Sequence, residues 1–148
     1  MKSSKSSHTS VHILLVDDNA LGLAARKSVL EEHGYRITTA SGGLEALDLM
    51  TGHEFQLLVT DFKMPRMTGV ELIAEVRKQR PDIPVILLSG FADTLGLSET
   101  NSGADAVIQK SAAEVQHLVR TVGRLLRKAP RKPVGAHQSN AKAKIQAV

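Results

Sequence analysis

Five short apolar runs recur along the first three quarters of this chain, and the segments between them are longer and mixed in polarity. The runs are rich in Val, Ile and Leu, which favour strands, and they span residues 12–16, 36–40, 56–60, 84–88 and 105–109. Three of them are almost continuously apolar, which is typical of parallel strands that are covered on both faces. We therefore predict five strands.

The segments between the runs have the length and polarity of helices. Residues 20–33 and 43–51 fit helices, and Gly34 supplies an end signal for the first. Residues 92–101 fit poorly, because four of them have low helix propensity: Gly96, Ser98, Thr100 and Asn101. We expect this segment to be short or mobile.

Two segments carry a hydroxyl residue followed three positions later by Glu, which is the spacing of a capping box. The two pairs are Thr68 with Glu71 and Ser111 with Glu114, and we predict that a helix begins after each hydroxyl residue. Behind the second pair, apolar residues recur three and four positions apart along one stripe: Val115, Leu118, Val119, Val122, Leu125 and Leu126.

Strands that alternate with helices of this length indicate right-handed βαβ crossovers. We predict an α/β fold with a doubly wound, five-stranded parallel sheet. In such a sheet the carboxyl ends of the strands share one edge, and ligands bind in the crevice outside that edge. The residues that directly follow each strand are therefore the candidates for a functional site.

Polar residues follow four of the predicted strands. Asp17 and Asp18 follow the first strand, Asp61 the third, Ser89 the fourth and Lys110 the fifth. Three carboxylates that converge repel one another, and a divalent cation would relieve the repulsion. Because the donors are hard oxygens without Cys or a nearby His, they favour Mg²⁺ over zinc.

The same residues suit a phosphoryl group. The hydroxyl of Ser89 and the ammonium of Lys110 match phosphoryl oxygens. Because phosphoryl transfer needs mainly positioning and charge neutralisation, and a carboxylate can act as the nucleophile, we predict that Asp61 accepts the phosphoryl group. Each residue alone also fits an ordinary turn, cap or surface position, but their coincidence at four strand ends favours a site.

Charge and composition indicate where the folded domain begins and ends along the chain. The chain holds 19 Lys and Arg against 15 Asp and Glu, and six of the basic residues lie in residues 1–10 and 129–148, where no acidic residue occurs. These ends lack apolar periodicity, so we predict disordered tails around one folded domain at residues 11–128. A weak attraction of the tails to nucleic acid is a less favoured alternative to plain solubility.

Several classes of protein are excluded or disfavoured. The chain has no Cys, which excludes disulfides and thiolate chemistry. No run approaches the roughly 18 apolar residues of a membrane span, and the N-terminal residues lack the apolar core of a signal peptide. The six His lack metal-ligand spacing, and we expect them to face solvent. We expect a cytoplasmic protein.

The residues at the strand ends resemble the receiver domain of two-component response regulators, the flavodoxin-like fold of chemotaxis-type signalling proteins. The matching segments, in family order, are ILLVDDN (13–19), LLVTDFKMPRMTG (57–69), VILLSG (85–90) and GADAVIQK (103–110). The resemblance extends over about residues 11–128. The acidic pair, the Asp-x-x-Met-Pro-x-Met-x-Gly string and the later lysine form a specific combination.

The resemblance implies a role for the acidic residues. Asp61 would accept a phosphoryl group from a phosphohistidine on a sensor kinase or phosphotransfer protein, with at most weak self-phosphorylation and autodephosphorylation. Mg²⁺ would be held by Asp17, Asp18, Asp61 and the backbone carbonyl of Lys63. The output would pass through contacts with a partner protein that the sequence does not identify, at a two-state surface around the fourth and fifth helices.

The resemblance also assigns the later strand ends, and the sequence shows three departures from the family, at Lys63, Val107 and Ser111. Ser89 would hydrogen-bond a phosphoryl oxygen, and Lys110 would pair with the phosphate or, beforehand, with Asp61. Val107 stands where the family usually has Tyr or Phe, and Ser111 stands where it usually has Pro. We expect a trans peptide bond before Ser111, and we expect movement of the loop after the fourth strand to replace the usual aromatic switch.

Three alternatives remain open. A metal-dependent phosphohydrolase could use Asp61 as its nucleophile, but such enzymes commonly carry Asp-x-Asp, and Lys63 stands at the second position here. A degenerate receiver that acts as a phosphorylation-independent adaptor is favoured by Val107 and Ser111. Direct DNA regulation would require salt-dependent binding through residues 129–148. A phosphorylation-activated signalling domain, rather than a metabolic enzyme, accounts for most of the residues.

Overall fold

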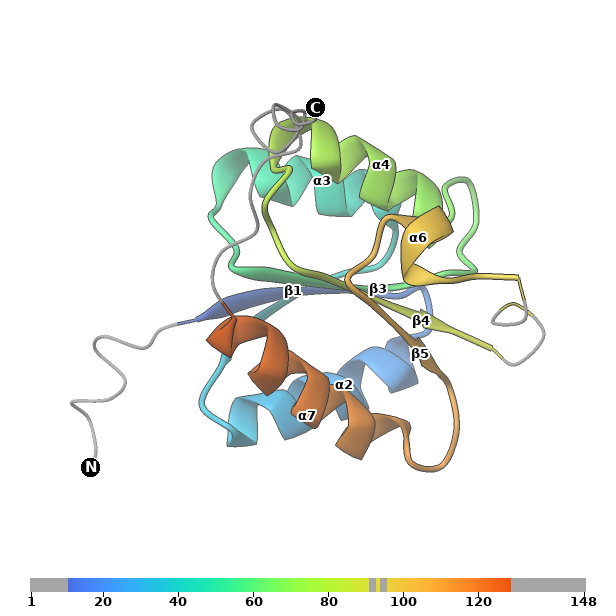
Figure 1. The fold of residues 1–148 in the computed structure, drawn as a ribbon. Helices are drawn as coiled ribbons and strands as arrows, with labels where there is room; N and C mark the ends of the chain where they lie inside the picture. Colours follow the sequence, from blue (N-terminus) through green and yellow to red (C-terminus); the bar gives the residue numbers. More distant parts are fainter. Residues whose placement is uncertain (1–10, 91–92, 94–95, 129–148) are drawn as a thin grey trace, which may run out of the picture.

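Strands and helices alternate along the chain in the computed structural model, which describes residues 11–90, 93 and 96–128 (Figure 1). The strands are β1 (His12–Val16), β2 (Arg36–Ala40), β3 (Leu57–Asp61), β4 (Val85–Ser89) and β5 (Ala106–Gln109). The helices are α2 (Ala20–Glu32), α3 (Gly43–Gly52), α4 (Gly69–Gln79), α6 (Glu99–Ser102) and α7 (Glu114–Arg127). Every predicted strand is present, within one residue of its expected bounds.

The five strands form one parallel sheet in the order β2-β1-β3-β4-β5. The chain leaves β1 toward β2 on one side and returns to place β3 on the other side, so the strand order reverses at β1. A crevice opens at such a reversal, outside the carboxyl ends of the strands. The predicted doubly wound parallel sheet is confirmed.

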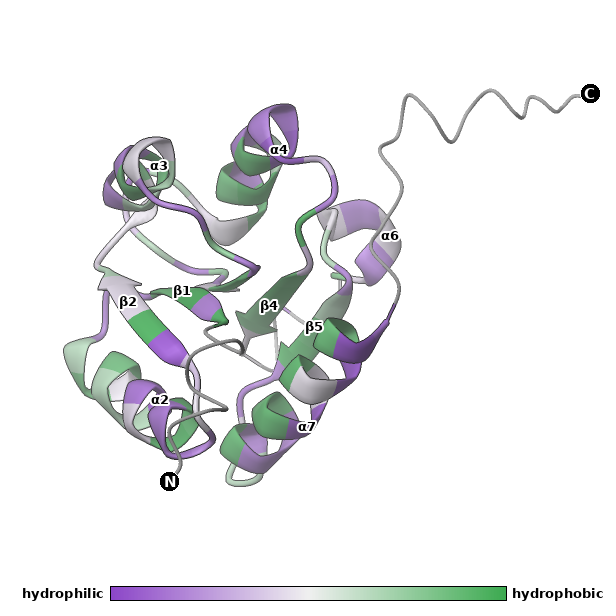
Figure 2. Ribbon diagram, turned by 90° about the vertical axis from the view of Figure 1, so that its left-hand side faces the viewer, coloured by the Kyte–Doolittle hydropathy of each residue, from purple (hydrophilic) through white to green (hydrophobic). Residues whose placement is uncertain are grey.

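Helices cover both faces of the sheet, with α3 and α4 on one face and α2 and α7 on the other (Figure 1). Alternate residues of β1 point to opposite faces of the sheet. Leu14 packs in the hydrophobic cluster under α3 and α4, whereas Ile13 and Leu15 pack in the cluster under α2 and α7. Figure 2 shows the apolar central strands and the apolar sides that the helices turn toward them. All residues of β1, β3 and β4 are buried, as the continuous apolar runs predicted.

The two predicted capping boxes differ in outcome. At α4 the prediction is confirmed, since Thr68 Oγ1 accepts from the Glu71 N–H at 3.1 Å and Glu71 Oε1 accepts from the Thr68 N–H at 2.9 Å. The prediction for Ser111 is wrong, because α7 begins only at Glu114 and its N-terminus has no side-chain cap. The physical reason is that the Glu114 carboxylate is buried in an ion pair with an arginine of α2 and cannot reach back to residue 111.

The segment at 92–101 is described only at residues 93 and 96–101, so the expectation that it is short or mobile stays a prediction. Helix α6 has four residues and begins after Ser98, whose Oγ accepts from the Asn101 N–H at 3.3 Å. Residues 91, 92, 94 and 95 lie outside the described residues, as do 1–10 and 129–148, so the predicted disorder of the tails stays a prediction. Among the described helices, none has the length and apolar character needed to cross a membrane.

His12 contradicts the expectation that every histidine faces solvent. It lies in β1, the strand next to the edge strand β2, and is buried, with its Nε2 2.6 Å from Thr38 Oγ1 and its Nδ1 3.0 Å from an Arg36 guanidinium nitrogen. Burial, followed by the positive charge of Arg36, lowers the pKa of His12 below its usual value. His12 therefore packs as a neutral core residue at the end of the sheet remote from the strand-end carboxylates.

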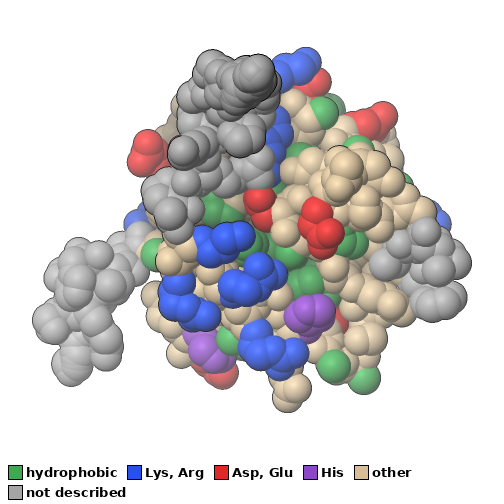
Figure 3. Space-filling model, viewed as in Figure 1, with side chains coloured by type: hydrophobic (Ala, Val, Ile, Leu, Met, Phe, Trp, Pro, Cys, Tyr) green, Lys and Arg blue, Asp and Glu red, His purple; other side chains and the backbone are tan. Residues whose placement is uncertain are grey.

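The outward face of α7 is basic. Arg120, Arg124 and Arg127 are exposed there, and they form no ion pair with a carboxylate in the described part of the chain. A shallow groove of about 630 Å³ runs beside them and is lined on its other side by His33 and Tyr35. Figure 3 shows Lys, Arg and His side chains gathered over this helix.

Candidate functional site

Three carboxylates meet where β1 and β3 end. Asp17 and Asp18 directly follow β1, and Asp61 is the last residue of β3. The parallel register pairs Val16 with Thr60, so the next residues of the two strands, Asp17 and Asp61, lie side by side. One oxygen of each of the three carboxylates lies within 4.8 Å of the others, with Asp17 and Asp61 buried and Asp18 exposed. The sheet therefore brings the predicted acidic cluster together.

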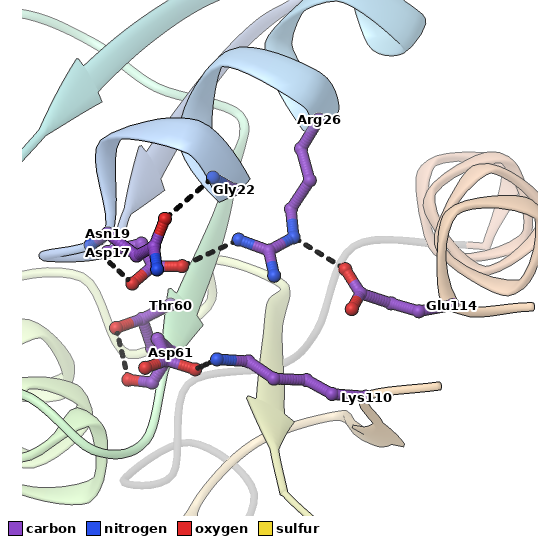
Figure 4. A network of polar contacts seen from close by, with 8 residues as sticks. All are labelled: Asp17, Asn19, Gly22, Arg26, Thr60, Asp61, Lys110 and Glu114. Carbon is purple, nitrogen blue, oxygen red and sulfur yellow. Dashed lines mark hydrogen bonds and ion pairs between the residues drawn. The ribbon is translucent and has the colours of Figure 1, made fainter. Parts of the chain in front are cut away.

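Lys110 places a cation beside Asp61. It directly follows β5, and its Nζ forms an ion pair with Asp61 Oδ1 (Figure 4). The backbone N–H of Lys110 donates to the carbonyl of Ser89 at 2.8 Å, which fixes the lysine beside the end of β4. The predicted pairing of Lys110 with Asp61 is thus present.

The environment of Asp61 has opposing effects on the pKa of its carboxyl group. Burial raises the pKa of Asp61 above its ordinary value, and the hydrogen bond from Lys110 opposes that rise. The negative charge of Asp17 adds to the rise. The position therefore disfavours an isolated negative charge and favours a carboxylate whose charge is balanced by cations.

Other predicted site residues border the same edge. Ser89 is the last residue of β4 and is buried, while Lys63 is exposed in the loop after Asp61. Val107 occupies the middle of β5 and is partly buried against the core cluster under α3 and α4. The small side chain of Val107 leaves β5 without an aromatic ring at this point.

The loop after Asp61 folds back against the end of β3. The Phe62 N–H donates to the carbonyl of Leu88, and the Gly69 N–H donates to the carbonyl of Phe62, both at 2.8 Å. A Cβ atom at Gly69 would lie 2.3 Å from the carbonyl oxygen of Asp61, so no larger residue fits without moving the backbone of Asp61. Arg66 turns the loop through the left-handed region, with φ of 70°. The glycine that ends the sequence motif therefore restricts the backbone of Asp61.

The segment after β1 also serves the ordinary structural role that its sequence allowed. Asp17 Oδ1 accepts from the Asn19 N–H at 3.0 Å, and Asn19 Oδ1 accepts from the Gly22 N–H at 3.0 Å and caps α2. The cap and the acidic pocket coexist because Asp17 has two oxygens that face different partners.

Two charged residues of this network were not predicted from the sequence. Arg26 of α2 is buried, and its Nη1 donates to Asp17 Oδ2 at 2.7 Å while its Nε donates to Glu114 Oε2 at 2.5 Å (Figure 4). A signal for Arg26 did exist in the sequence, since it follows Leu23 by three positions and precedes Leu30 by four. That spacing places Arg26 on the apolar face of its helix.

Comparisons with known proteins agree with the geometry. Residues 13–122 match the family model of the response regulator receiver domain. The chain is 37% identical to the transcriptional regulatory protein GlrR of Escherichia coli over 83 residues, which are 56% of this chain and 19% of GlrR. It is 32% identical to the sensor kinase CckA of Brucella abortus over 121 residues, or 80% of this chain and 13% of CckA. The chain thus spans about a fifth or less of these two relatives.

Solved structures share the fold at similar identity. The response regulator TrrA of Thermotoga maritima, solved in complex with Mg²⁺-BeF, is 34% identical with a TM-score of 0.70, covering 78% of this chain and 98% of that one. A CheY-like receiver domain from Methanospirillum hungatei is 31% identical with a TM-score of 0.70, covering 79% and 94%. The chain belongs to the response regulator receiver domain family, and it has the phosphoacceptor role of that family in two-component signalling.

Proposed function

We propose that Asp61 is the residue that accepts the phosphoryl group, from a phosphohistidine on a sensor kinase or phosphotransfer protein. The observation that carries this assignment is the ion pair between the buried Asp61 and Lys110, at the strand edge where two further carboxylates converge. Phosphoryl transfer depends on positioning and charge neutralisation, and this pocket offers both. A bond forms between an Asp61 oxygen and phosphorus as the phosphorus–nitrogen bond of the donor breaks.

The acidic cluster fits Mg²⁺. Oxygens of Asp17, Asp18 and Asp61 are close enough to share one ion, and hard carboxylate oxygens are the ligands that Mg²⁺ prefers. The backbone carbonyl of Lys63 completes the proposed protein ligands. When bound, Mg²⁺ supplies the positive charge that lets a phosphoryl group approach three carboxylates.

The remaining residues act on the phosphoryl oxygens. Lys110 opposes the effect of burial on Asp61 and then pairs with the new phosphate. The hydroxyl of Ser89 donates a hydrogen bond to another oxygen. Because no side chain in this set is an evident strong base for water, we expect self-catalysed phosphorylation and dephosphorylation to be weak, and we assign a signalling role in the cytoplasm and no metabolic reaction.

The output passes to a partner protein through α6 and α7, the two helices that flank β5. Val107 of β5 lacks the ring that is usual in the family, so the change on phosphorylation reaches these helices by another route. The basic segment at 129–148 is not required for this output, and direct DNA binding is the less favoured alternative.

Intact mass spectrometry after incubation with acetyl phosphate and Mg²⁺ tests the acceptor directly. We expect one added phosphate on the wild type, and none without metal or in Asp61→Asn. The absence of an adduct, together with the absence of Mg²⁺ binding by calorimetric titration, would instead support the phosphorylation-independent adaptor. Turnover of small phosphate esters would support the phosphohydrolase.

A further inference from the structure

Arg26 lies between two carboxylates that belong to different parts of the molecule (Figure 4). One is Asp17, at 2.7 Å in the acidic pocket, and the other is Glu114, at 2.5 Å in the first turn of α7. The side chains of Arg26, Asp17 and Glu114 are only 8%, 2% and 11% exposed. Because water screens these charges poorly, a change at either carboxylate acts strongly on the guanidinium.

The fold around Arg26 is shaped to hold the guanidinium. A Cβ atom at Gly22, one turn before Arg26 in α2, would lie 3.2 Å from Arg26 Nη1 and 3.4 Å from Asp17 Oδ2. Glycine at this position therefore leaves the room that the ion pair occupies. Helices α2 and α7 contact each other, and the Arg26–Glu114 pair bridges them at the end nearest the pocket.

The charges joined by these contacts form a group of four carboxylates and two cations: Asp17, Asp18, Asp61, Glu114, Lys110 and Arg26. Without a metal ion, two negative charges in this group are uncompensated. One divalent cation in the acidic pocket would balance the group. The cation would also weaken the attraction between Asp17 and Arg26, so the guanidinium would act more strongly on Glu114.

We propose that Arg26 is a positioning residue that transmits the charge of the acidic pocket to the first turn of α7. When the negative charge of Asp17 is neutralised, Arg26 holds Glu114 more firmly and α7 is more tightly anchored. This route runs along the α2–α7 side of the sheet and does not need an aromatic ring at Val107. The physiological trigger rests on the proposed function, whereas the sharing of one guanidinium by two carboxylates does not.

Hydrogen exchange without metal tests the link by itself. The variant Asp17→Asn removes the charge that competes with Glu114, and we expect amide exchange at His117, whose N–H donates to Ala113, to slow by about threefold. Asp18→Asn is the matched control, because it removes the same charge from the next residue, which has no contact with Arg26 among the described residues.

The same exchange measurement in variants that lack Arg26 shows whether Arg26 carries the effect. In Arg26→Met, the exchange rate at His117 should no longer respond to Asp17→Asn. If the single Arg26 variant does not fold, Arg26→Met with Glu114→Leu replaces the buried ion pair by apolar contact and serves instead. A response that persists without Arg26, or an equal response to Asp18→Asn, would overturn the proposal.

Calorimetric titration with Mg²⁺ provides a second readout. Arg26→Met should bind Mg²⁺ about tenfold more tightly, because it loses a cation beside Asp17, and Glu114→Gln should bind more weakly, because the guanidinium then serves Asp17 alone. If both variants bound Mg²⁺ with the same affinity as each other or as the wild type, this result would contradict the proposal that Asp17 and Glu114 share the Arg26 guanidinium. A wild type that binds no Mg²⁺ would defeat the proposed function, and the metal-free exchange experiment would still decide on Arg26.

Discussion

Asp61 combines two properties that oppose each other at the scale of a single side chain. A nucleophilic carboxylate must be ionised, yet burial raises the pKa of Asp61 and favours its neutral form. Lys110 offsets part of this effect through its ion pair. The ionised form of Asp61 therefore costs folding free energy, which binding of cations can return.

The variant Asp61→Asn should accordingly stabilise the metal-free protein at pH 7. Because the folded-state pKa of Asp61 is raised above the unfolded value of about 3.9, the stability linked to its protonated form is present below that value and is lost as the pH rises through the folded pKa. Asparagine resembles the protonated carboxyl group at every pH. The free energy of unfolding in urea should exceed that of the wild type at pH 7 and match it near pH 3.

An exposed carboxylate provides the control for that titration. Asp48 lies on the surface of α3, and Asp48→Asn should change the free energy of unfolding by less than about 0.5 kcal/mol at either pH. A destabilised Asp61→Asn at pH 7 would show that the ion pair with Lys110 outweighs the cost of burial.

A second prediction at the residue scale concerns the substitution of Gly69. The variant Gly69→Ala places a methyl group 2.3 Å from the carbonyl oxygen of Asp61, so the end of β3 must shift. We expect a loss of about 2 kcal/mol in the free energy of unfolding and slower phosphorylation by acetyl phosphate. Gly52→Ala is the matched control, since its Cβ meets nothing within 4 Å and the helix end should keep or gain stability.

At the scale of elements, two sequence patterns with the same spacing had different outcomes. Thr68 and Glu71 cap α4 because both partners are local and exposed, so the sequence pattern contains the whole interaction. Ser111 and Glu114 do not form a box because Glu114 pairs with Arg26, a residue 88 positions away. A local pattern predicts a local contact only where no distant residue competes for the same side chain.

The same contrast yields a prediction for the two helix starts. Thr68→Ala should lower the free energy of unfolding by about 1 kcal/mol, because α4 loses its side-chain cap. Ser111→Ala should change it by less than about 0.5 kcal/mol, because the Ser111 hydroxyl accepts from the nearby Ala113 N–H at 3.3 Å and does not cap α7. Urea denaturation of both variants measures the difference, and equal losses would contradict the observed start of α7.

The residues of the functional site show the same contrast. Some of their positions follow from the parallel topology of the sheet, and others depend on packing between distant elements. Asp17, Asp61 and Lys110 were predictable because each directly follows or ends a strand, and a parallel sheet brings such positions to one edge. Arg26 was missed because a charged residue in a helix is ordinarily on the surface. Its burial depends on the partners on either side of it, one in the pocket and one on α7.

For the molecule as a whole, charge is unevenly distributed along the chain. Residues 115–148 contain eight of the 19 Lys and Arg and no Asp or Glu, whereas residues 1–114 contain all 15 acidic residues. The exposed arginines of α7 belong to the basic part (Figure 3). The described part of the molecule should therefore present a basic surface on α7 to an approaching polyanion.

Chromatography on immobilised heparin measures that asymmetry. The wild type should be retained at low salt, and the triple variant Arg120→Gln, Arg124→Gln and Arg127→Gln should elute at clearly lower salt. Lys78→Gln is the control, because the exposed Lys78 lies on α4, on the opposite face of the sheet from α7. Equal elution of the triple variant and the wild type would place the binding in the remaining basic residues.

The order of the strands also has a consequence for how the nascent chain folds. No two neighbouring strands of the sheet are joined by a hairpin, and the acidic pocket draws Asp17 from the start of the chain and Lys110 from beyond the last strand. A nascent chain that has not yet docked β5 holds its carboxylates without Lys110, the lysine that pairs with Asp61. The proposed phosphorylation of Asp61 therefore depends on the docking of β5, and a copy of the domain truncated before Lys110 should gain no phosphate from acetyl phosphate.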